Sequence, residues 1–125
     1  MPDNFPNNDI DLSFLNEIAD GSDEFIVESI TMFLEQAPEM LEGISAAIDS
    51  KDWVAAAATA HKLKPTLGFF GMTNSQGLMQ QVELMCKAGG STPDTIVENF
   101  NQANSIIDTN LTALTRLKEE KEAGL

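Results

Sequence analysis

The residue of this chain that could do the most chemistry is its one histidine, His61. An imidazole can act as a nucleophile, a proton carrier or a metal ligand near neutral pH. A transition-metal site needs several nitrogen or sulfur ligands, and the chain offers only this histidine and one cysteine, Cys86. We therefore expect no metal site, and we expect Cys86 to be a small buried hydrophobic residue.

The charge around His61 differs from that of the rest of the chain. Twenty acidic and seven basic residues give a formal net charge of −13. Residues 53–82 contain no acidic residue and two lysines, Lys62 and Lys64. The histidine thus lies in a basic island, although the bulk charge argues against binding to nucleic acid or to anionic membrane surfaces.

The remaining composition points to one small domain inside the cell. A single cysteine cannot form an intramolecular disulfide, which suggests a reducing, cytoplasmic compartment. Residues 1–5 lack the basic and apolar segments of a signal peptide. No apolar run approaches about 18 residues, so we expect no membrane span.

Hydrophobic residues recur at helical spacing along most of the chain, and no segment alternates as a strand does. We expect a long helix capped by Ser22, which Pro38 either bends or divides into two shorter helices. Thr73 and Gln76 match a capping box at the start of a later helix. The expected helices cover residues 11–19, 22–49, 53–70, 73–88 and 93–117.

These elements predict an all-α fold, an antiparallel up-down four-helix bundle with a short extra N-terminal helix. We expect residues 1–10 to form a flexible arm, residues 11–118 to form the domain and residues 119–125 to fray. Among these elements, the helix over residues 53–70 carries the histidine.

On a wheel of about 100° per residue, the buried arc of that helix lies well away from His61. The ring should therefore face solvent, with Lys64 one turn along and Gly68 beyond. Most single histidines on helices are surface residues without a role. However, a glycine inside a helix costs about 1 kcal/mol relative to alanine, and clearance for a docking partner would explain it. The expected buried arc is Ala56, Ala60, Leu63, Leu67 and Phe70.

Residues 60–71, with the sequence AHKLKPTLGFFG, resemble the signature of histidine-containing phosphotransfer (HPt) domains. That signature has alanine before the histidine, leucine two residues after it, lysine at +3, a small residue at +7 and glycine at +10. The similarity extends over about residues 11–117. It implies that His61 accepts a phosphoryl group, that Lys64 helps to neutralise it, and that Gly68 and Gly71 keep the surface accessible.

The resemblance also implies that Glu83, at +22 on the next helix, hydrogen-bonds the imidazole. A carboxylate that holds Nδ1–H would fix the tautomer and leave Nε2 as the nucleophile. The phosphoryl group, of charge about −2, would form beside Lys64 and near Lys62. Phosphoryl transfer needs positioning and charge neutralisation more than covalent help.

The resemblance implies a monomeric phosphocarrier without autonomous catalysis. It would take phosphate from the receiver domain of a hybrid histidine kinase and pass it to a response regulator. It needs no cofactor of its own, because the partner receiver domain supplies the aspartate and Mg²⁺. The alternative is a helical adaptor that binds a receiver or another signalling protein without carrying phosphate. A covered His61 or an averted Lys64 would favour the adaptor.

Two residues depart from the HPt pattern. Pro65 stands at +4, where a small residue is usual, and should kink or widen the helix under the site. Phe69 stands at +8, where a small polar residue is more usual, and is either an apolar docking contact or ordinary core. Both substitutions affect the expected choice of partner more than the transfer itself.

Overall fold

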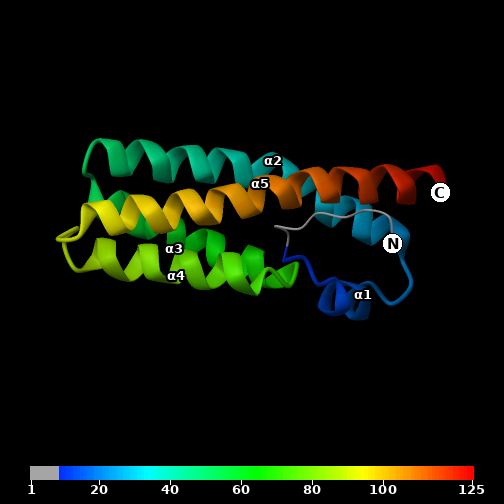
Figure 1. The fold of residues 1–125 in the computed structure, drawn as a ribbon. Helices are drawn as coiled ribbons and strands as arrows, with labels where there is room; N and C mark the ends of the chain where they lie inside the picture. Colours follow the sequence, from blue (N-terminus) through cyan, green and yellow to red (C-terminus); the bar gives the residue numbers. More distant parts are fainter. Residues whose placement is uncertain (1–8) are drawn as a thin grey trace.

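The structure is a computed structural model that describes residues 9–125. Residues 1–8, most of the expected arm, lie outside that range. The described chain is all-helical, as expected, and residues 9–125 contain no strand (Figure 1). Its five helices are α1 (Ser13–Ala19), α2 (Asp23–Asp49), α3 (Trp53–Phe69), α4 (Thr73–Lys87) and α5 (Pro93–Ala123).

Side-chain caps fix the starts of α2 and α3. The Ser22 hydroxyl accepts a hydrogen bond from the Phe25 amide at 3.1 Å, as the sequence predicts. The Asp52 carboxylate accepts one from the Ala55 amide at 3.2 Å. Pro38 lies inside α2, which continues through it as one helix. The alternative of two shorter helices is therefore wrong.

The predicted capping box at the start of α4 is also wrong. Thr73 is already inside the helix, and Met72, which precedes it, makes no side-chain capping hydrogen bond. The chain reverses tightly at Gly71, and the Met72 amide donates to the Leu67 carbonyl at 3.0 Å. Met72 is fully buried. This turn moves the helix start by one residue and leaves the Gln76 side chain to reach α3 instead.

The long helices contact one another in a closed ring. α2 packs against α3 and α5, and α4 also packs against α3 and α5. Figure 1 shows these four helices running side by side, with α1 at one end against α2. The apolar inner faces form one core, and the whole predicted buried arc of α3 is buried there. This packing leaves the outer faces of α3 and α4 exposed to solvent.

Both ends of the described chain have features that the sequence did not predict. The Asp9 carboxylate accepts hydrogen bonds from the Ser75 amide at 2.7 Å and from the Asn110 side-chain amide at 2.8 Å. Ser75 and Asn110 are buried, so Asp9 satisfies polar groups that water cannot reach. At the other end, α5 continues to Ala123, so residues 119–123, expected to fray, are helical.

Each helix of residues 9–125 is too short or too polar to span a lipid bilayer.

Candidate functional site

His61 lies on the outer face of α3 with its side chain 66% exposed. The prediction of a solvent-facing ring is confirmed. Pro65 lies one turn later, and α3 continues past it to Phe69 as a single helix. Because proline has no N–H, the His61 carbonyl lacks the hydrogen bond that a helix normally gives it.

A buried carboxylate from α4 holds the ring. The Glu83 side chain is only 3% exposed, and its Oε2 lies 2.9 Å from His61 Nδ1. Its Oε2 also lies 2.9 Å from Lys87 Nζ, and its Oε1 lies 2.6 Å from Lys64 Nζ. One carboxylate therefore meets the imidazole and two ammonium groups.

These partners keep the carboxylate ionised. Burial raises the pKa of Glu83, but the contacts with Lys64, Lys87 and His61 outweigh it, and the pKa falls from 4.5 to about 2. An ionised carboxylate only accepts hydrogen bonds, so a neutral His61 ring must donate from Nδ1. Its Nε2 then carries the free lone pair and is the atom available for nucleophilic chemistry.

Lys64 is held close to the ring. Its side chain is 19% exposed, and its ammonium donates to Gln80 Oε1 as well as pairing with Glu83. Sequence reasoning missed Gln80, although it lies one turn before Glu83 on α4. Lys64 and Lys87 together carry one more positive charge than Glu83 neutralises. Lys62, which is exposed, adds another positive charge. The site is therefore ready to receive an anion.

The two glycines of the motif are needed for contacts within the chain itself. Gly71 adopts a φ of +71°, and a Cβ there would lie 2.2 Å from the Asp11 carbonyl oxygen. A Cβ at Gly68 would lie 2.8 Å from Gln76 Nε2. The space beside both glycines is thus filled by residues of this chain, which differs from the expected clearance for a partner.

Phe69 combines features of core and surface. It is half-buried, and its ring meets the rings of Phe14 and Phe70 edge-on, with centroids 5.9 and 5.3 Å apart. It also lines a groove of about 450 Å³ between α2 and α3. The groove is lined by Phe25, Ser29, Met32, Phe33, Gln36, Pro65, Thr66, Phe69 and Phe70. Phe69 and Pro65 therefore shape one apolar hollow a turn beyond His61, and neither covers the imidazole.

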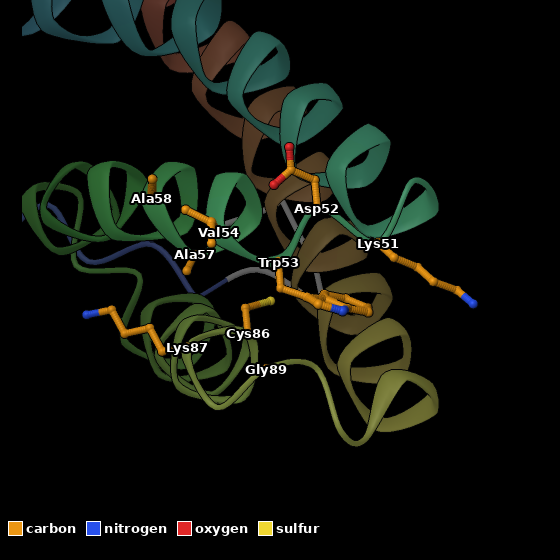
Figure 2. A pocket seen from close by; sticks show the side chains of 9 residues that line it. All are labelled: Lys51, Asp52, Trp53, Val54, Ala57, Ala58, Cys86, Lys87 and Gly89. Atoms are coloured by element: carbon orange, nitrogen blue, oxygen red, sulfur yellow. The ribbon is translucent and has the colours of Figure 1, made fainter.

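A second hollow lies toward the start of α3, on the other side of His61 along the helix. Its volume is about 570 Å³, and Figure 2 shows Lys51 and Lys87 at opposite ends of it. Cys86, which is buried as expected, contributes to its lining, and burial raises the pKa of the thiol. Apolar hollows thus flank the histidine on both sides.

The pKa of Glu83 predicts how stability depends on pH. Its carboxyl binds a proton near pH 4.5 when unfolded and only near pH 2 when folded. The stabilisation is therefore complete above about pH 5 and is lost as the pH falls from there through 2. Replacing Glu83 by glutamine should remove this dependence.

Urea unfolding of the wild type and of Glu83→Gln, from pH 6 to pH 2.5, measures this pH dependence of stability. Because the site borders solvent, we expect the wild type to lose about 1–2 kcal/mol more than Glu83→Gln over that range. Parallel stability curves for the two proteins would show that the ion pairs around Glu83 do not contribute.

Comparison with known proteins identifies a family. A family model described as Hpt domain matches residues 28–119, well over half of the chain. No curated protein and no solved structure matches the chain.

Proposed function

The chain belongs to the Hpt domain family, whose function is histidine phosphotransfer in phosphorelays, and we propose that His61 is its phosphoryl-accepting residue. One observation carries the assignment. The ring of His61 is exposed, while its Nδ1 is held by a buried, ionised Glu83 at 2.9 Å. A surface histidine without a role needs no such partner.

The proposed step moves one phosphoryl group between two side chains. The Nε2 lone pair of His61 attacks phosphorus in the partner's aspartyl phosphate, and an N–P bond forms as the bond to the aspartate oxygen breaks. The aspartate leaves as a carboxylate. The Nδ1 proton stays on the ring, which becomes positively charged, and the Glu83 carboxylate stabilises that charge.

Lys64 has the second role in this step. Its ammonium lies against Glu83, one helical turn from His61, and can turn toward the phosphoryl oxygens as negative charge arrives. Lys62 contributes to the same local field. These positive charges stabilise the phosphorylated state, because the phosphoryl group brings about two negative charges to a protein that is already acidic.

We propose that the partners are receiver domains of hybrid histidine kinases and of response regulators, and that the receiver brings the Mg²⁺ that the transfer needs. The Glu83 oxygens already meet two lysines and the imidazole, so this carboxylate suits a cationic side chain better than a metal ion. The chain itself would act as a cytoplasmic monomer. It would position the phosphoryl group rather than catalyse a reaction alone.

The proposed role uses α2 to α5 as an antiparallel up-down four-helix bundle. The ring of pairwise helix contacts supports this arrangement, as do the short connections between α2, α3, α4 and α5. In such a bundle the exposed faces of α3 and α4 form one side, and the receiver would dock there. Pro65 and Phe69, which line the groove beyond the histidine, are the proposed apolar contacts.

A helical adaptor that binds a receiver without taking phosphate remains the alternative function. Burial of His61 or an averted Lys64 would have favoured it. Instead, the ring is exposed and Lys64 shares Glu83 with it. These features support the phosphocarrier.

Incubating the purified chain with a phosphorylated receiver domain and Mg²⁺ tests the proposal. We expect transfer of radiolabelled phosphate to the chain, as a phosphohistidine that is labile to acid and stable to alkali. An adaptor would form a complex with the receiver but acquire no label. That result would overturn the proposed function.

A further inference from the structure

We propose that Gln76 is a positioning residue of the phosphoryl-accepting site, because its side chain holds the turn of α3 that carries Lys64. We further propose that position 68 is glycine because a larger residue would leave no space for the Gln76 side chain. This inference rests on the proposed function for its kinetic consequences. Its structural part concerns the unphosphorylated chain alone.

The contact that carries the inference joins α4 to the backbone of α3. Gln76 lies in the first turn of α4, and its Nε2 donates to the Lys64 carbonyl at 3.0 Å. A Cβ at Gly68 would lie 2.8 Å from that same nitrogen, closer than real side chains approach. The glutamine amide therefore crosses α3 directly over the glycine, in the space that any larger residue would fill.

Pro65 explains why this turn needs an external restraint. It directly follows Lys64, has no N–H to donate to the His61 carbonyl, and its ring crowds that carbonyl. A helix loses rigidity where a hydrogen bond of its ladder is missing. The hydrogen bond from Gln76 ties the Lys64 carbonyl, which directly precedes Pro65, to the neighbouring helix α4.

The other polar residues on this face of α4 act on the same target. Positions 76, 80, 83 and 87 are spaced by four, three and four residues, so they lie along one face of the helix. Gln76 holds the Lys64 backbone, while Gln80 and Glu83 hold its ammonium. Lys64 is thus fixed at both ends, and Glu83 extends the same row to the imidazole.

A double-mutant cycle separates this proposal from the view that Gly68 gives access to a partner. We expect Gln76→Ala to lower the rate of transfer within the receiver complex about three- to tenfold, with the KM for the phosphorylated receiver unchanged. Gly68→Ala should cause a similar loss, because its methyl group displaces the glutamine amide. The double variant should be no worse than either single variant, since both remove one contact.

Two outcomes of the cycle would overturn the proposal. One is wild-type transfer by Gln76→Ala. The other is an added loss, or a raised KM, when Gly68→Ala is introduced into the Gln76→Ala chain, since this would place the glycine against the partner. Gln81→Ala is the matched control, because Gln81 is exposed on another face of α4, and it should transfer like the wild type.

NMR of the unphosphorylated chain keeps this test independent of the proposed function. Gln76→Ala should shift the Lys64 carbonyl ¹³C resonance and speed proton exchange at the Lys64 ammonium, whereas Gln81→Ala should change neither. Unchanged Lys64 resonances in Gln76→Ala would overturn the positioning role. If no variant or wild-type chain accepts phosphate but the Lys64 resonances move as expected, the proposed function fails and the positioning of Lys64 stands.

Discussion

Replacing His61 by glutamine is expected to abolish phosphoryl labelling of this chain. Glutamine resembles histidine in reach and polarity, but its amide nitrogen has no lone pair available to attack phosphorus. Because the His61 side chain is 66% exposed and Glu83 keeps Lys64 and Lys87 as partners when the imidazole is lost, the substitution should change the free energy of unfolding by no more than about 1 kcal/mol. Labelling by a phosphorylated receiver, with urea unfolding beside it, measures both quantities.

Lys62→Gln is the matched control for His61→Gln. Lys62 is the neighbouring exposed residue and lies outside the Glu83 contacts. The Lys62→Gln variant should still accept phosphate on His61, with at most a modest loss of rate, because the substitution removes only one of the positive charges near the site. Labelling of His61→Gln to the wild-type extent would place the acceptor elsewhere and contradict the account.

Replacing Glu83 by alanine is expected to slow phosphoryl transfer about a hundredfold, in the range for loss of a group that assists proton placement. The variant loses the acceptor that selects the Nδ1–H tautomer, and it releases Lys64 and Lys87 from their shared partner. The first change leaves Nε2 less often available as the nucleophile, and the second leaves the two ammonium groups less well placed to neutralise the phosphoryl group. Rapid-quench transfer from a phosphorylated receiver measures the rate.

Glu83→Gln separates the two effects of that carboxylate. Its amide oxygen can still accept from Nδ1–H, but the negative charge that pairs with Lys64 is gone. Its rate should therefore lie between those of the wild type and Glu83→Ala. Equal rates for the alanine variant and the wild type would mean that Glu83 serves only the packing of α4.

The sequence predicts this fold well where the signals are local. Ser22 caps α2 because its hydroxyl accepts from an amide three residues later, a contact that needs no other part of the chain. The exposure of His61 follows from the period of a single helix, since the apolar residues of α3 mark the opposite arc. The family match to residues 28–119 agrees with the resemblance read from residues 60–71.

The prediction fails where two distant segments meet. Thr73 and Gln76 have the right spacing for a capping box, yet Gln76 instead reaches the Lys64 carbonyl twelve residues earlier. A helical wheel of α3 alone predicts open space beside Gly68, but the Gln76 side chain of α4 fills that space. Asp9 is similar, because its partners Ser75 and Asn110 lie far along the chain. Periodicity within one element cannot supply such contacts.

The most direct test of the central claim is to locate phosphorus on the His61 ring. Phosphorylate the ¹⁵N-labelled chain with a phosphorylated receiver, and record the scalar coupling between ³¹P and the two imidazole nitrogens by NMR in alkaline solution. The arrangement of His61 Nδ1 against Glu83 at 2.9 Å predicts coupling to Nε2. Coupling to Nδ1, or phosphorus on any residue other than His61, would contradict it.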